Sequence, residues 1–183
     1  MKIRTIFTLT AAALLSLVFS GAIAAQPPAA AAEKPDVLAV ARKVAEKARY
    51  CSLITIGPDG RAESRIVDPF VPEEDWTVWI ATRPVTRKVE QIRKNSHVTL
   101  SYWEAGSMGF VTLLGDAELV DDPKEKAKHW KPEWAQFHFY SDENRGADYL
   151  LIRVKPHRLE VVSFADGLNG DPETWAPPQH LFE

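Results

Sequence analysis

Short β-rich segments joined by tight turns make up most of this sequence. Residues 51–56 form one such segment, Gly57-Pro58-Asp59-Gly60 is a strong turn signal, and residues 61–69 return as the second arm of a hairpin. Further β-rich segments are predicted at 76–82, 97–103, 110–120, 149–154 and 158–163. The last two are predicted to form another hairpin across Lys155-Pro156-His157. Consecutive hairpins without strand–helix–strand alternation predict a small barrel of six or seven antiparallel strands rather than a parallel sheet.

Short helices are predicted between these segments. The first begins at Pro35-Asp36, the second spans 84–94, and the third begins at Asp122-Pro123 and breaks near Pro132. Gly115, inside the 110–120 segment, predicts a bulge or a sharp bend in that strand. The predicted fold class is therefore mainly β, of the α+β type, with helices inserted between the strands.

The first 25 residues have the pattern of a signal peptide. Two basic residues precede an uncharged apolar stretch, and Ala22-Ile23-Ala24 has the small–x–small pattern that a signal peptidase reads. A retained membrane anchor is the alternative, but the stretch is at the short end for a span of ~20 residues. We expect export to the periplasm or the exterior without stable membrane anchoring. Residues 26–34 are rich in Pro and Ala and read as a linker, which leaves 35–183 as one domain.

Composition narrows the function classes. With 45% hydrophobic residues the chain has enough apolar side chains for a core. The formal net charge is -3, and a mildly acidic, mixed surface argues against a nucleic-acid partner. Cys51 is the only cysteine, so no internal disulfide can form, and its apolar neighbours predict a buried packing role. The five histidines show no metal-ligand spacing, so no metal site is predicted.

Cations and hydroxyls gather around the end of one predicted strand and the start of the second helix. Residues 81–88 read Ala-Thr-Arg-Pro-Val-Thr-Arg-Lys, and Arg65 lies on the neighbouring hairpin arm. Arg87 and Lys88 fall in the first helical turn, where the helix dipole favours anions, so their placement makes more sense if an anion binds there. Helix-terminal N–H groups, threonine hydroxyls and a guanidinium are the donors that a phosphate monoester needs. A solvated basic helix face is the alternative interpretation.

The order of these motifs resembles the pyridoxamine 5′-phosphate oxidase family, and most closely its general stress protein 26 branch. The shared features are Arg65-Ile66-Val67, a strand ending in Ala-Thr, a following Thr-Arg-Lys, a helix ending at Asn95, and a long strand with Gly-Asp-Ala-Glu at 115–118. The resemblance covers roughly residues 34–163. It implies a split β-barrel that forms a homodimer, with FMN held between the two subunits.

The resemblance also implies a set of cofactor-binding residues. They are Arg65, Ile66, Val67, Thr82, Thr86, Arg87 and Lys88. The cations and hydroxyls of this set would hold the phosphate, and the backbone of the two apolar residues would border the flavin ring. Three tryptophans, Trp103, Trp130 and Trp175, could line the ring pocket, although a buried core position is the expectation for each.

The chain departs from true pyridoxamine phosphate oxidases where those enzymes hold the substrate's phosphate. Phe70 stands near the position of a lysine, and the tail from Ser163 to Glu183 contains no arginine to accompany His180. A doubly charged substrate phosphate would be poorly neutralised, so oxidation of vitamin B6 is not expected. The resemblance therefore implies an FMN-dependent oxidoreductase with another substrate, and no catalytic residue can be named.

Three alternatives stay open at this point. The first is a flavin-binding or stress module without catalysis. The second is a barrel of the same kind that binds haem or the deazaflavin F420, and a haem site would need a histidine or another ligand facing the interface. The third is a relict site, because the basic start of the chain has no twin-arginine pair and an exported protein would have to acquire FMN outside the cytoplasm.

Overall fold

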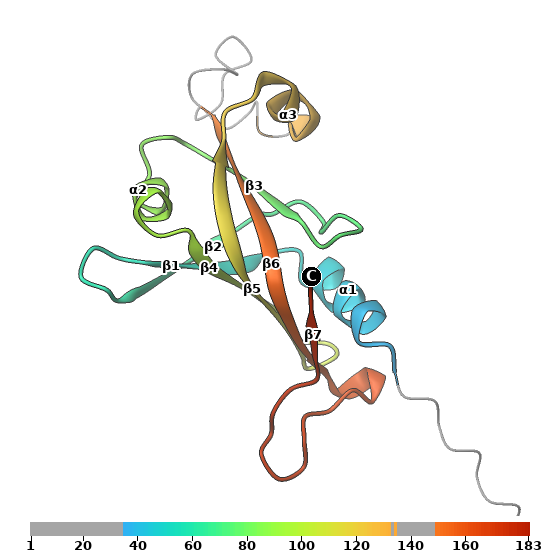
Figure 1. The fold of residues 1–183 in the computed structure, drawn as a ribbon. Coiled ribbons are helices and arrows are strands. Elements are labelled where there is room, and N and C mark those ends of the chain that lie inside the picture. The colour runs from blue at the N-terminus through green and yellow to red at the C-terminus, as the bar shows by residue number, and fades with distance from the viewer. Residues whose placement is uncertain (1–34, 133, 135–148) are drawn as a thin grey trace, which may run out of the picture. The chain divides into compact units, whose positions relative to one another are not determined.

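The computed structural model describes residues 35–132, 134 and 149–183. The predicted signal peptide and linker, as well as His138, lie outside these residues. Seven strands form one antiparallel sheet (Figure 1). They are β1 (Cys51–Ile56), β2 (Ala62–Val67), β3 (Val78–Thr82), β4 (His97–Glu104), β5 (Gly109–Val120), β6 (Leu150–Ser163) and β7 (Gln179–Leu181). None of the described helices is long and apolar enough to cross a membrane.

The sheet order places β2 and β3, the strands that carry or precede the candidate site residues, at opposite ends of the sheet. The strands run β2-β1-β4-β5-β6-β3, and β7 pairs with β6 outside this path. The chain after β2 then returns to β3, because the Phe70 N–H donates to the Trp79 carbonyl at 2.8 Å. The sheet is thus a split barrel whose end strands β2 and β3 are brought together without a continuous ladder between them. This confirms the predicted fold class.

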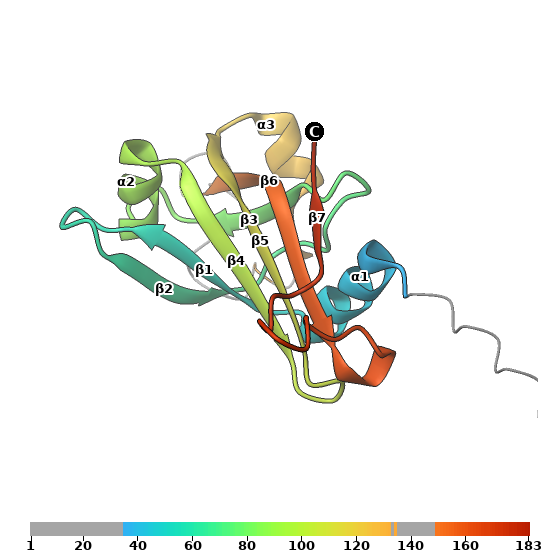
Figure 2. The same ribbon diagram turned by 60° about the horizontal axis from the view of Figure 1, so that its bottom comes forward.

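Three α-helices are inserted between the strands: α1 (Val37–Ala48), α2 (Arg87–Lys94) and α3 (Pro123–Lys128). The Asp36 carboxylate accepts the Leu38 N–H at 2.9 Å and so begins α1. Four residues on one face of α1 are buried: Val40, Ala41, Val44 and Ala45. This face packs against β4, β5 and β6, and Figure 2 shows α1 beside β6 and β7. The apolar stripe that predicts this helix is therefore also what docks it on the sheet.

Alternation along the strands separates the core from the outer face. On β4, Val98, Leu100 and Tyr102 are buried, while Trp103 at the next position is 61% exposed. Trp175 in the tail is 78% exposed, so the expectation of a buried core position is wrong for both tryptophans. Trp130 is half-buried and packs against a smaller aromatic cluster. Period-two alternation explains the outward position of Trp103.

Cys51 lies in the core, as its apolar neighbours predict. Its side chain is buried at the start of β1, and burial raises the pKa of the thiol to about 12. A thiol with such a pKa carries almost no thiolate near neutral pH, so it is a packing residue rather than a nucleophile.

The predicted hairpin across 155–157 is wrong, because Leu150–Ser163 is one continuous strand. Its ladder with β5 is continuous except for a register shift between Leu114 and Gly115, opposite Pro156. This shift confirms the bulge predicted at Gly115. Pro156 is tolerated inside the strand because β3 pairs with residues before it and β7 with residues after it.

Two predicted helix boundaries also differ from the structure. The second helix begins at Arg87 rather than near Pro84, because the preceding residues form a turn in which the Thr86 N–H donates to the Arg83 carbonyl at 3.2 Å. The third helix begins at Pro123 as predicted but ends at Lys128, before Trp130. The Asp122 carboxylate accepts two backbone N–H groups at its start, so the predicted cap is confirmed.

Candidate functional site

A hollow lies where the two end strands β2 and β3 meet the first turn of α2. Its volume is about 310 Å³. The lining residues are Ile66, Val67, Asp68, Ala81, Thr82, Arg83, Thr86, Lys88 and Trp134. Five of the seven residues proposed from the sequence therefore line one hollow, although they come from segments on opposite ends of the sheet path.

Two threonine hydroxyls lie close together at the start of α2. The Oγ1 atoms of Thr82, at the end of β3, and of Thr86, just before α2, are 3.2 Å apart. Thr86 stands at the cap position of α2, but its hydroxyl makes no capping hydrogen bond to the helix and donates to the Arg83 carbonyl at 3.0 Å. The first N–H groups of a helix have no partner within the helix, and they carry its positive dipole end. Hydroxyls and backbone donors therefore converge where an anion would be favoured.

Lys88 supplies a half-buried positive charge beside these donors. In the described part of the chain its amine has no hydrogen bond and no ion pair. Burial lowers the pKa of Lys88, and the charge of Arg65 lowers it further. Both effects disfavour the ammonium form, and a neighbouring anion would offset both.

Arg65 contacts a residue of α2 but does not line the hollow. Its guanidinium donates to the Thr55 Oγ1 at 2.5 Å and to the Gln91 Oε1 at 2.9 Å. The Thr55 hydroxyl also donates to Gln91 Oε1, at 2.6 Å, so the three side chains form one polar network under α2. Burial lowers the pKa of Arg65, the charge of Glu63 raises it, and Arg87 lowers it again. Arg65 is thus a fixed, mostly buried cation.

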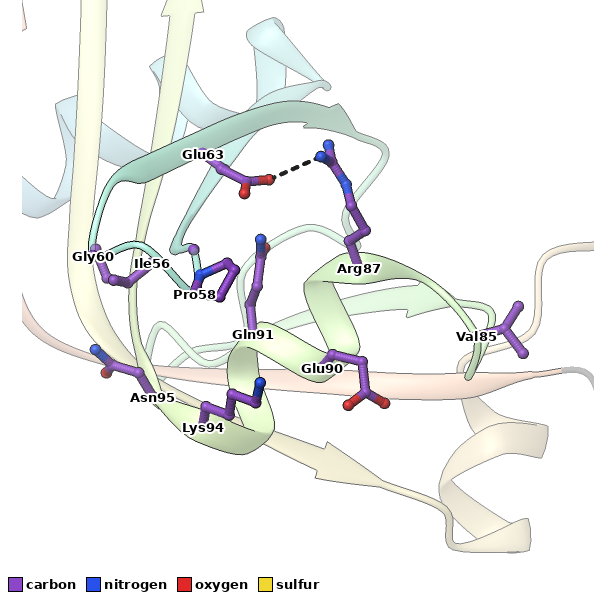
Figure 3. Close-up of a pocket in the computed structure, with 11 residues that line it drawn as sticks. Ile56, Pro58, Gly60, Glu63, Val85, Arg87, Glu90, Gln91, Lys94 and Asn95 are labelled. Carbon is purple, nitrogen blue, oxygen red and sulfur yellow. Dashed lines mark ion pairs between the residues drawn. The ribbon is translucent and has the colours of Figure 1, made fainter.

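Arg87 lines a second hollow rather than the first. This hollow has a volume of about 590 Å³ and lies between the β1–β2 turn and α2 (Figure 3). Arg87 is largely exposed there and forms an ion pair with Glu63 at 3.3 Å. Because Arg65 acts electrostatically on both Arg87 and Lys88, the three cations form a single cluster, which spans the two hollows.

The structure adds residues that sequence reasoning missed. Gln91 lies one turn after Arg87, and this helical spacing is a signal that could have placed it beside the cations. Arg83 stands inside the 81–88 segment and could have been included on that ground. Asp68 directly follows Val67 and could have been included on that ground, whereas Trp134 reaches the hollow through packing of a distant segment, for which no local pattern exists.

The donor set fits a flavin phosphate. A half-buried cation with no ion pair in the described part of the chain, two hydroxyls and a helix start are what a phosphate monoester needs. Ile66 and Val67 at the end of β2 also line this hollow. Phe70, which stands near the position of the family's lysine, packs on Trp134, and Lys131 beside it is paired with Asp68 at 3.2 Å.

Comparison with solved structures gives three informative relatives. General Stress Protein 26 from Bacillus anthracis str. Sterne is 20% identical, with a TM-score of 0.57 over 67% of this chain and 90% of that chain. A pyridoxamine 5′-phosphate oxidase-related, FMN binding protein from Nostoc punctiforme is 15% identical, with a TM-score of 0.56 over 80% of this chain and 95% of the other. A heme binding protein from Mycobacterium smegmatis is also 15% identical, with a TM-score of 0.55. The match covers 71% of this chain and 55% of that chain. At such identities the likeness concerns the fold alone.

Sequence comparison is more specific. No curated protein sequence matches the chain. The family model described as pyridoxamine 5′-phosphate oxidase matches residues 38–163, which is more than half of the chain and includes both segments that line the hollow. The chain therefore belongs to the pyridoxamine 5′-phosphate oxidase family.

Proposed function

We propose that the protein binds FMN, with the phosphate at the start of α2 and the flavin ring in the hollow between β2 and β3. The observation that carries this proposal is the state of Lys88, a half-buried cation that forms no ion pair with the described residues and lies beside two hydroxyls. A partly desolvated charge without a partner is unfavourable, and a phosphate would supply the missing anion.

Each residue of the site has a distinct part in this proposal. Lys88, Thr82, Thr86 and the first N–H groups of α2 would bind the phosphate oxygens directly. Arg65 and Arg87, which do not line this hollow, would add positive charge from nearby. The backbone at Ile66 and Val67 would hold the edge of the ring. Bound flavin supplies electron or hydride transfer, while the chain orients the ring and limits the access of water.

We further propose that a second copy of the chain completes the site. The hollow is shallow, so one subunit would leave much of a flavin ring exposed. Ile66, next to the hollow, is 69% exposed, and Val85 before α2 is 79% exposed. Apolar side chains at the rim of a polar site are typical of surfaces that a partner covers.

The proposed activity is that of an FMN-dependent oxidoreductase whose substrate is not pyridoxamine phosphate. The tail contains no arginine, and Phe70 packs in an aromatic cluster, so a second phosphate lacks its cations. A flavin-binding module without turnover is the alternative. Reduction of the bound flavin by a nicotinamide donor, followed by return of the oxidised spectrum in air, would distinguish the two. For an exported protein, a flavin-loaded form in the periplasm would also argue against a relict site.

The visible spectrum of the protein after incubation with FMN and desalting tests the binding. We expect the flavin bands to persist, and we expect Lys88→Ala or Arg65→Ala to weaken FMN binding by roughly tenfold to a hundredfold, the range for a hydrogen bond to a charged group. Lys94→Ala, at the far end of α2, removes the same charge and is the matched control. A protein that stays colourless, or that binds FMN equally well without Lys88, would contradict the proposal.

The same spectrum tests the haem alternative. His97 and His157 are exposed, and one ring nitrogen of each lies 2.7 Å from a carboxylate oxygen of Asp116. Both imidazoles border an apolar hollow of about 280 Å³. A carboxylate partner is common for histidines that bind metals through their other nitrogen. A Soret band on adding haem, lost in His97→Ala or His157→Ala, would favour that alternative over FMN.

A further inference from the structure

Glu63 adds a negative charge to the cation cluster beside the proposed phosphate site, from the larger hollow. It lies on β2, two residues before Arg65, and its side chain faces α2 across the larger hollow (Figure 3). Its Oε2 atom lies 3.5 Å from Arg65 and 3.3 Å from Arg87. The carboxylate therefore contacts two of the three cations that the phosphate would share.

Glu63 is the internal counter-charge of this cluster. Among the described residues, no other carboxylate forms an ion pair with Arg65, Arg87 or Lys88. Glu90, which lies on the same helix, is paired with Arg93 instead. Two of the cations are thus neutralised in part from within the chain, while Lys88 has no such partner.

The ion pairs of Glu63 with Arg65 and Arg87 are not fixed by a hydrogen bond. Glu63 Oε2 is buried and makes no hydrogen bond, although two guanidinium groups lie within ion-pair distance. The side chain as a whole is 27% exposed and the Arg87 side chain is 81% exposed, so both can move. Electrostatic attraction without a fixed hydrogen bond holds the carboxylate in place, so its effect on the cluster is mainly one of charge.

We infer that Glu63 offsets the positive charge that Arg65 and Arg87 would direct at the phosphate of the ligand, and that it thereby sets how strongly the site prefers a phosphorylated over an unphosphorylated flavin. This inference rests on the proposed function. A carboxylate and a phosphate within one cation cluster repel each other, and the repulsion is appreciable at partly buried positions. Removing the carboxylate frees the cations for the phosphate and leaves contacts with the ring unchanged.

Flavin fluorescence titrations with FMN and with riboflavin test this inference. Glu63→Gln keeps the size of the side chain and removes its charge, so we expect the dissociation constant for FMN to fall at least about tenfold, whereas that for riboflavin stays within about twofold. Glu90→Gln removes one negative charge from α2 without touching Arg65 or Arg87, and we expect it to change neither constant. Glu63→Thr provides a second uncharged variant with a residue that strands favour.

The outcomes separate the inference from the function on which it rests. Wild-type protein that binds FMN with the same affinity as both Glu63 variants overturns the inference and leaves FMN binding intact. An equal gain for FMN and riboflavin also overturns it, because the effect then does not come from the phosphate. If neither the wild type nor any folded variant binds FMN, both proposals fail. FMN binding that appears only when Glu63 is replaced supports the inference strongly.

Discussion

Lys88 and Arg65 occupy different environments, although both are proposed to attract the phosphate. Lys88 has no partner within the described residues, whereas Arg65 is held by Thr55 and Gln91. Loss of Lys88 would therefore remove a contact with the ligand, while loss of Arg65 would also leave the Gln91 side chain without one of its donors. For this reason Lys88 variants report more directly on phosphate binding than Arg65 variants do.

The lowered pKa of Lys88 predicts a pH dependence of FMN affinity. A bound phosphate favours the charged amine, so affinity falls as pH rises through the pKa of Lys88 in the free protein, which burial holds below that of an ordinary lysine. Over the same range the free protein gains stability with rising pH, because the unfolded chain retains this proton longer.

Lys88→Arg provides the comparison, because a guanidinium stays charged throughout. Titrations of FMN from about pH 7 to about pH 10 should show a fall in the affinity of the wild type relative to the variant. Parallel profiles for the two proteins would mean that Lys88 does not hold its proton for the phosphate.

At the scale of elements, the bulge between β5 and β6 depends on a glycine. A Cβ at Gly115 would lie 2.1 Å from the Lys155 carbonyl oxygen and 2.6 Å from the Pro156 Cα, which are backbone atoms that cannot turn away. We expect Gly115→Ala to lower the free energy of unfolding by about 3 kcal/mol, at the upper end of the usual cost of overpacking.

Urea unfolding followed by circular dichroism would measure this loss. Gly106→Ala is the control, because its Cβ would meet only the end of the flexible Glu104 side chain, at 2.9 Å. A loss of equal size in both variants would show that the close approach at Gly115 is not what matters.

The same elements show what the sequence can predict. The hairpin around Gly57-Pro58-Asp59-Gly60 is confirmed, with Cys51 opposite Val67, because a four-residue turn signal is local. The same local reasoning predicts a turn at Pro156, and this prediction is wrong. The strand continues through Pro156 because a bulge lies opposite it and because β3 and β7 pair on either side of it. Such compensation is tertiary and leaves no local pattern. The short strand β7 likewise forms only through pairing with β6.

At the scale of the whole molecule, the barrel fold brings two segments of the site together. Val67 and Thr82 belong to the end strands of the sheet, and both line one hollow because the chain after β2 folds back along β3. The order of motifs was enough to propose these residues. It was not enough to show that Arg87 and Lys88 face different hollows, since this depends on how α2 sits on the sheet.

A crystal structure of the protein grown with FMN tests the central claim most directly. We predict that the phosphate lies within hydrogen-bond distance, about 2.7–3.2 Å, of the Lys88 amine and of the Thr82 or Thr86 hydroxyl, with the ring against Ile66 and Val67. A phosphate bound elsewhere, or crystals without flavin at saturating FMN, would contradict the account.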